Sequence, residues 1–410
     1  MFDLQAAWDR PAHAAVSNGE HVLRVRIAAR PLPGGSSGLP LRLAMALDTS
    51  GSMEGEKLDR AKRAVSSVLA LLRPEDKIWL VSFATDVKPV LDGIPGGPDA
   101  RRRGESAVSG LVASGVTRTD SALDWIGRVL PVEQGTVRAG ILVTDGHPTD
   151  PRGSVLTEVD AIISQAAALA RRGVAVSTVG LGSAADFNSD FLVNLCDRGG
   201  GSFLFADSPD ALEGRLRGQL LNAQKAATAQ GVLILKALGA DAKVRAICRI
   251  RPEYAPMDVS SRVQLGVLRA DQPTDFLVAV SLPAAGFGGE LGSRAVLGVR
   301  LESGAYSTET EAAIEYTNTF SRVQQVNREV DRDRILWELN TYAADLAKSN
   351  NGTVTVRLLE NISATARQLG KDDIAKQADK ALASAHASGK VSPDQSTRLR
   401  ETTRRAGETT

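Results

Sequence analysis

The sequence has little cysteine, few aromatic residues, no long apolar run and almost no net charge. Its two cysteines, Cys196 and Cys248, fall in different predicted domains, so neither a disulfide framework nor a zinc site is expected, and we expect buried thiols in a reducing compartment. No stretch approaches the ~20 apolar residues that span a bilayer, and the first residues do not resemble a secretory signal. A formal net charge of +1 gives no electrostatic reason to expect nucleic-acid binding. We therefore expect a cytoplasmic protein that binds neither membranes nor nucleic acid.

The length of the chain predicts more than one domain. With 410 residues it is too long for one ordinary core, and its 43% hydrophobic content is typical of a globular protein. From 41 to 224, short apolar runs alternate with amphipathic segments, which include helices expected at Lys57–Leu72 and near 99–113, 119–130 and 154–172. This alternation predicts a doubly wound, Rossmann-like α/β domain with a parallel sheet and helices on both faces.

In the segment from 225 to 318, apolar residues recur with a different spacing. It reads as six strands separated by turn residues, with no helix between them, which is typical of an antiparallel β-sandwich. Residues 1–40 hold two more strand-like segments and a linker rich in glycine and proline. Two strands are not stable alone, so we expect them to complete the sandwich. The α/β domain would then be inserted into that sandwich.

The remainder of the chain, from 319, is predicted to be helical. Apolar residues at helical spacing predict helices at Phe320–Lys348, Gly352–Leu369 and Asp372–Ala387, so a helical bundle or αα-hairpins would occupy 319–391. Residues 392–410 are polar and mostly charged, and we expect a polar tail without fixed structure.

A group of oxygen-bearing side chains follows two of the buried strands. The run Leu43–Asp48 ends in the pattern Asp48-x-Ser50-x-Ser52, and a second apolar run ends in Asp145. Between them, a polar turn before a predicted helix offers the hydroxyl of Thr117. Ligands bind at the carboxyl ends of strands in open α/β sheets, and carboxylates with hydroxyls suit Mg²⁺ better than zinc or copper. The pattern therefore predicts a magnesium site, with Mn²⁺ or Ca²⁺ as alternatives.

These five residues, in type and order, resemble the metal-ion-dependent adhesion site of the von Willebrand factor A family, and the resemblance covers about Leu41 to Leu221. It implies that Ser50 and Ser52 bind the ion directly, that Asp48 and Asp145 often act through water, and that Thr117 joins in one of two arrangements. It also implies an open coordination position for an Asp or Glu of a partner protein. Relatives of the bacterial type often work beside AAA-type ATPases, so such an ATPase, or another copy of this chain, is an expected partner in assembly or regulation of a complex.

Other interpretations compete with this one. Asp48 to Ser52 and Thr117 could simply cap helices, and Asp145 could lie in a simple turn. Arg118 could attract an acidic partner and His147 could contact a ligand, although an exposed charge and an exposed loop histidine are the simpler explanations. A metal-dependent phosphatase or hydrolase on a similar sheet is the alternative function, yet the second aspartate of an Asp-x-Asp-x-Thr motif is Ser50 here, and no Gly-x-Ser-x-Gly elbow lies at a strand–helix turn. A metal site that only stabilises loops is a third possibility. We expect a protein that is not an enzyme.

Overall fold

The computed structural model describes residues 2–29, 38–206, 209–238, 242–285, 290–388 and 390–407. The chain divides into two compact units. The α/β unit comprises Ser36–Ala229 with Gly266–Leu268, and the strand–helix unit comprises Met1–Gly35, Gln230–Leu265 and Arg269–Thr410. Most of the predicted linker, at 30–37, lies outside the described residues.

The α/β unit is built on a six-stranded sheet. Its strand order is β6-β5-β4-β7-β8-β9, and every neighbouring pair is parallel except β5 with β6. Because β4 has β5 on one side and β7 on the other, the chain changes direction across the sheet at β4. The strands are β4 (Leu41–Asp48), β5 (Lys77–Phe83), β6 (Val87–Pro95), β7 (Val137–Thr144), β8 (Val174–Leu181) and β9 (Gly200–Ala206).

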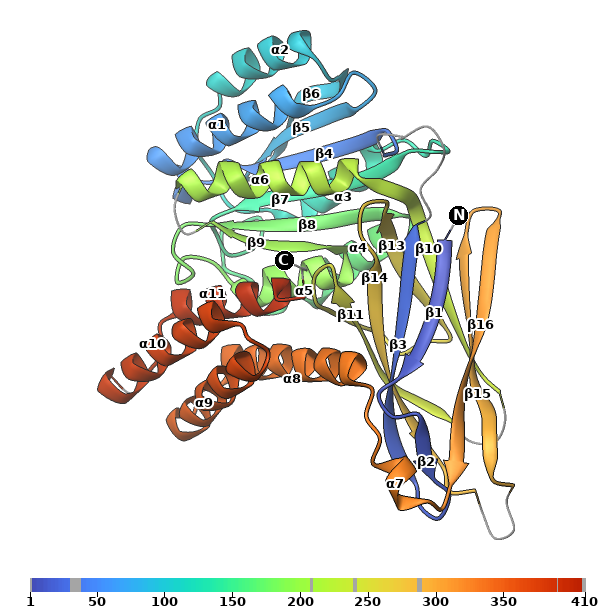
Figure 1. Ribbon diagram of the computed structural model, residues 1–410. Helices are drawn as coiled ribbons and strands as arrows, with labels where there is room; N and C mark the ends of the chain where they lie inside the picture. Colours follow the sequence, from blue (N-terminus) through green and yellow to red (C-terminus); the bar gives the residue numbers. More distant parts are fainter. Residues whose placement is uncertain are drawn as a thin grey trace. The chain divides into compact units, whose positions relative to one another are not determined.

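Helices cover both faces of this sheet, as Figure 1 shows. Every residue of β4 is buried, and Leu43 and Met45 pack into one layer whereas Ala44 and Ala46 pack into the other. This confirms the predicted α/β architecture with helices on both faces, although the sheet is mixed because the edge strand β6 runs antiparallel to β5. One layer contains α1 (Glu56–Leu71), α2 (Pro98–Ser109) and α6 (Pro209–Gln224), and the other contains α3 (Thr119–Val129), α4 (Asp160–Arg171) and α5 (Ser189–Arg198).

The prediction that a helix begins near residue 154 is wrong, because α4 begins at Asp160. The Asp150 carboxylate accepts hydrogen bonds from the backbone N–H groups of Arg152 and Ser154, both at 2.8 Å. An aspartate that bonds nearby backbone groups in this way favours a turn over a helix. The loop from β7 to α4 is therefore longer than expected.

Two five-stranded sheets dominate the strand–helix unit. Strands near the N-terminus join strands far along the chain: Val25 pairs with Phe276, and Tyr316 pairs with His13. Among the described residues after 225 there are seven strands, not the six predicted, and the short strand β12 (Ala255–Met257) is the additional one. One sheet has the order β1 (Phe2–Trp8), β3 (Gly19–Ala29), β14 (Thr274–Leu282), β11 (Lys243–Arg251), β12 (Ala255–Met257); the other has β13 (Arg262–Arg269), β10 (Ala226–Ala237), β15 (Gly292–Ser303), β16 (Tyr306–Thr317), β2 (Ala12–Ala14).

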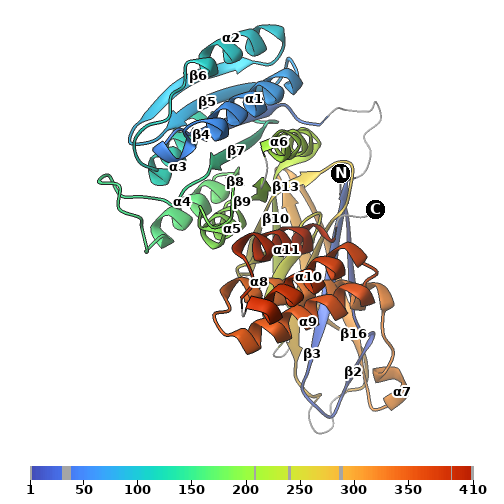
Figure 2. The ribbon, with the colours of Figure 1, turned by 90° about the vertical axis from the view of Figure 1, so that its left-hand side faces the viewer.

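The C-terminal part of this unit is helical, and four of its helices gather together in Figure 2. The predicted helix at 320–348 is broken into two, because the Asn327 side chain accepts a bond from Val330 N and caps a new helix there. No described helix is both long and apolar enough to cross a membrane. The helices are α7 (Phe320–Val323), α8 (Arg328–Lys348), α9 (Gly352–Gln368), α10 (Asp372–Ser388) and α11 (Pro393–Arg405).

The expectation of an unstructured polar tail at 392–410 is also wrong for most of that segment. Ser392 and Gln395 form a reciprocal capping box at the start of α11. Leu399 is buried, and the buried Arg404 guanidinium lies 3.1 Å from the carboxylate of Glu253, which is also buried. The polar composition is misleading here because charged residues of the helix are paired inside the fold. Residues 408–410 lie outside the described part of the chain.

Candidate metal centre

The predicted metal-binding residues converge at the carboxyl ends of β4 and β7. Asp48 is the last residue of β4, and Asp145 follows directly after β7, its neighbour in the sheet. The chain reverses its order across the sheet at β4, and such switch points are where open α/β sheets bind ligands. The fold thus brings residues almost a hundred positions apart to one edge.

Asp48 is fully buried, and both of its carboxylate oxygens accept hydrogen bonds. Oδ1 accepts from the backbone N–H of Ser50 at 2.8 Å, and Oδ2 accepts from the Thr144 hydroxyl at 2.5 Å. Burial raises the pKa of Asp48 to about 6, although the bonds from Thr144 and Ser50 oppose this. The carboxylate therefore holds the loop that carries Ser50 and Ser52 against Thr144, the last residue of β7.

Ser50, Ser52 and Asp145 form a continuous row of oxygens. The Ser52 hydroxyl donates to Asp145 Oδ1 at 2.7 Å, and its oxygen lies 3.1 Å from that of Ser50. Ser50 and Asp145 are buried, whereas Ser52 is exposed, so the row is open to solvent at Ser52. The three side chains are thus close enough to share one small cation.

Thr117 faces the same space from a third loop. A Cβ placed on Gly146 would lie 3.1 Å from the Thr117 hydroxyl oxygen and 3.5 Å from that of Ser52. Both hydroxyls therefore border one small cradle that any residue larger than glycine would enter. Backbone bonds hold the loops together, including Ser114 N to Thr49 O at 2.8 Å and Gly51 N to Gly115 O at 3.1 Å.

Lys57 is a functional candidate that the sequence reasoning missed. Its ammonium lies 2.6 Å from Asp145 Oδ2 and 3.6 Å from an oxygen of Asp186. Burial lowers the pKa of Lys57, but the hydrogen bond and charge of Asp145 outweigh it and the pKa is raised. A lysine in the first turn of α1 is unfavourable for the helix dipole. This unfavourable placement is the feature of the sequence that could have indicated a role for Lys57.

Arg118 and His147 lie on the loops that carry Thr117 and Asp145. The Arg118 guanidinium forms two hydrogen bonds with the Asp120 carboxylate, at 2.8 and 2.6 Å. Burial raises the pKa of Asp120, yet the bonds from Arg118 and backbone groups outweigh this and the pKa is lowered. Much of the positive charge of Arg118 is therefore compensated locally. His147 is half-buried, two residues after Asp145.

The side chains at this edge fit a hard divalent cation. The oxygens gathered there are three hydroxyls and the carboxylate of Asp145, with Asp48 behind them. Within the described part of the chain, no group of three or more His, Cys, Asp or Glu side chains could hold a metal ion. Oxygen ligands of this kind suit Mg²⁺, Mn²⁺ or Ca²⁺.

Comparison with known proteins shows to which class of domain the α/β unit belongs. The family model described as von Willebrand factor type A domain matches residues 41–205, so the chain contains a von Willebrand factor A domain. Domains of this class are generally protein-interaction modules and commonly bind a divalent metal.

Two relatives are similar in sequence to parts of the chain. Inter-alpha-trypsin inhibitor heavy chain H4 of Bos taurus is 29% identical over 161 residues, which is 33% of this chain and 17% of that protein. An uncharacterized protein of Synechocystis sp. is 24% identical over 286 residues, or 67% of this chain and 64% of that protein. The chain thus spans less than two thirds of either relative.

Two solved structures share the fold over nearly the whole chain. A von Willebrand factor type A protein from Catenulispora acidiphila has a TM-score of 0.81 at 17% identity and covers 98% of this chain and 96% of its own. The ArnB paralog VWA2 from Sulfolobus acidocaldarius has a TM-score of 0.63 at 16% identity and covers 100% and 99%. At these identities the likeness concerns the fold.

Proposed function

We propose that the protein is a metal-dependent interaction module that binds an acidic residue of a partner protein. The observation that carries this proposal is the row of Ser50, Ser52 and Asp145 oxygens, each joined to the next at 2.7–3.1 Å, with the Thr117 hydroxyl bordering the same cradle. We assign the direct ligand positions to Ser50, Ser52 and Thr117, with Asp48 and Asp145 supplying the nearby negative charge.

The charge of this group suits an acidic ligand. Neutral hydroxyls occupy the three direct ligand positions assigned above, and Lys57 already offsets part of the charge of Asp145. A bound Mg²⁺ would therefore keep much of its positive charge and an open coordination position that an Asp or Glu of the partner can occupy. Mn²⁺ and Ca²⁺ take the same kinds of oxygen and are the alternatives to Mg²⁺.

Exposed apolar residues near the site favour a protein as the ligand. Val112, on the loop that leads to Thr117, is 77% exposed, and Val155, on the loop that follows Asp145, is 56% exposed. The two loops approach one another, because a Cβ on Gly153 would lie 3.0 Å from a methyl carbon of Val116. The apolar core of a protein interface is built from side chains of this kind.

The structure also gives a reason to prefer binding over catalysis. A phosphatase of the aspartyl-phosphate type needs a carboxylate that can attack the substrate, and Asp48 stands at that position of the sheet. Its side chain is fully buried, and both of its oxygens already accept hydrogen bonds from Ser50 and Thr144. We therefore assign Asp48 a positioning role in a protein that is not an enzyme.

For the rest of the chain we infer a supporting role. The pairing of β3 with β14 and of β2 with β16 supports a β-sandwich into whose sequence the α/β unit is inserted. Such a scaffold with its helices would present the metal centre during assembly or regulation of a complex, whose other member could be an AAA-type ATPase or a second copy of this chain.

The test is capture of partners by the full chain from a native lysate, in Mg²⁺ and in EDTA. We expect proteins that bind in Mg²⁺ to be lost in EDTA, and also with the variants Asp48→Ala and Ser52→Ala. Ser66→Ala is the matched control, because among the described residues that hydroxyl bonds within α1 alone, to Lys62 O. Sizing with and without EDTA tests self-association. Capture of the same proteins under all these conditions would refute the proposal.

A further inference from the structure

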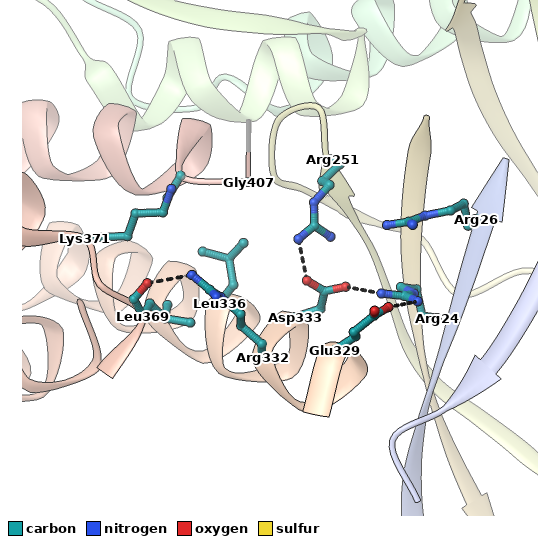
Figure 3. A pocket seen from close by; sticks show the side chains of 11 residues that line it. Arg24, Arg26, Arg251, Glu329, Arg332, Asp333, Leu336, Leu369, Lys371 and Gly407 are labelled. Carbon is teal, nitrogen blue, oxygen red and sulfur yellow. Dashed lines mark hydrogen bonds and ion pairs between the residues drawn. The ribbon is translucent and has the colours of Figure 1, made fainter. Parts of the chain in front are cut away.

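The strand–helix unit contains a hollow that the proposed function does not use. It has a volume of about 420 Å³ and is bordered by β3, β11, the start of α8 and the turn between α9 and α10 (Figure 3). Five of its lining residues are cations and two are carboxylates, and the buried carboxylate of Asp275 lies 2.8 Å from Arg26 and 3.1 Å from Arg251. The cations are Arg24, Arg26, Arg251, Arg332 and Lys371.

The carboxylates of the hollow are already engaged by arginines from the sheet. Asp333, buried at the start of α8, lies 2.6 Å from the Arg251 guanidinium and 3.3 Å from that of Arg24. Glu329, one turn earlier on α8, lies 3.0 Å from Arg24. Both carboxylates therefore neutralise arginines of the sheet, and within the described residues neither is paired with a cation on the opposite wall of the hollow.

The opposite wall carries positive charge without such compensation. Among the described residues, Arg332 donates one hydrogen bond, of 2.9 Å, to the backbone oxygen of Leu369, and its other guanidinium N–H groups have no partner there. Within the described part of the chain, no carboxylate forms an ion pair with Arg332 or with Lys371. Figure 3 shows both side chains on the side of Leu369, across the hollow from Arg251.

A second hollow, of about 460 Å³, continues the basic surface along α8. It shares Arg332 and Leu369 with the first and adds Arg328, one helical turn before Arg332. Arg328 likewise has no carboxylate partner among the residues described. Asp331 also lines this hollow but lies 2.8 Å from the Arg334 guanidinium, so Arg328 and Arg332 keep positive charge that a bound anion would compensate.

We propose that the hollow binds a compact anion through its phosphate groups. Guanidinium groups match the geometry of phosphate oxygens, and a lysine ammonium adds charge. Among the described residues, no aromatic side chain lines either hollow, so recognition would rest on charge and hydrogen bonds. The bound anion would join the turn between α9 and α10 to the Arg251 end of β11.

The experiment is a calorimetric titration of the full chain with inorganic pyrophosphate and, separately, with a phosphoserine peptide. Buffers are free of phosphate and divalent cations, so that the metal centre does not contribute. We expect one site per chain, and about tenfold weaker binding in Lys371→Met and in Arg332→Gln, as one charge-assisted hydrogen bond predicts. Lys371→Arg keeps the charge and should keep the affinity.

The control variant is Lys376→Met, which removes an exposed lysine of α10 that lies outside both hollows. Tighter binding of pyrophosphate identifies a free anion as the ligand, whereas tighter binding of the peptide identifies a phosphorylated protein segment; either supports the site. Absence of saturable binding by wild type would overturn the proposal. So would equal losses in Lys371→Met and Lys376→Met, because binding would then follow net charge alone.

Discussion

Replacement of Lys57 by methionine should strengthen metal binding while it weakens the metal-free fold. The Lys57 ammonium lies 2.6 Å from Oδ2 of Asp145, whose side chain is fully buried. An incoming cation must therefore compete with a resident cation for the same carboxylate. Methionine keeps much of the length of the lysine side chain but removes the charge, so that competition ends.

The size of the effect follows from the exposure of the pair. A hydrogen bond between charged groups contributes about 1.5–3 kcal/mol when shielded from water. The Lys57 side chain is 31% exposed, so solvent screening reduces this to about 1–2 kcal/mol. At 1.4 kcal/mol per factor of ten, we expect Mg²⁺ to bind about 5- to 30-fold more tightly to Lys57→Met. The metal-free variant should lose a similar free energy of unfolding.

Both quantities are measurable on the same samples. Calorimetric titration with Mg²⁺ gives the affinity, and urea unfolding in metal-free buffer gives the stability. Lys88→Met is the matched control, because Lys88 is an exposed lysine of β6 in the same unit. If Lys57→Met binds Mg²⁺ no better than wild type, Lys57 does not compete for Asp145, and its contact serves only to orient that carboxylate.

Three further outcomes are expected. Gly146→Ala should weaken Mg²⁺ binding at least about tenfold in calorimetry with little change in metal-free melting, because its Cβ would enter the cradle 3.1 Å from the Thr117 hydroxyl oxygen. Burial, and then the charge of His21, lower the pKa of His13 in the folded protein. As the pH falls, the unfolded chain therefore binds a proton at this histidine before the folded protein does. The free energy of unfolding in urea should thus fall as the pH drops below about 6.5, and it should fall less in His13→Gln. Leu399→Ala should cost about 2–5 kcal/mol in the same assay, because Leu399 is buried in the core of the C-terminal helices; a change near zero would mean that α11 is not packed.

The sequence was informative where structure depends on neighbouring residues. The apolar run of β4 and the polar turn after it indicated a strand end at a sheet edge, because strand burial and turn chemistry are local properties. The α/β alternation indicated the sheet for the same reason. The resemblance to a known family then suggested which distant loops would meet.

Features that depend on distant pairings could not be predicted in this way. The contact of Lys57 with Asp145 joins residues 88 positions apart, and the contact of Arg404 with Glu253 joins residues 151 apart. A charged segment such as α11 resembles a solvated tail until its buried partner is known. The basic hollow at Arg332 and Lys371 likewise exists only after α8, α9 and α10 are packed together.

The central claim is that five side chains from three loops hold one divalent cation. The most direct measurement is a crystal structure of the full chain grown with Mn²⁺, with anomalous diffraction recorded to locate the ion. We expect a single strong peak between Ser50, Ser52 and Thr117, with oxygen ligands at roughly 2.0–2.3 Å. Well-diffracting crystals with Mn²⁺ bound elsewhere, or with no peak at this edge of the sheet, would contradict the account.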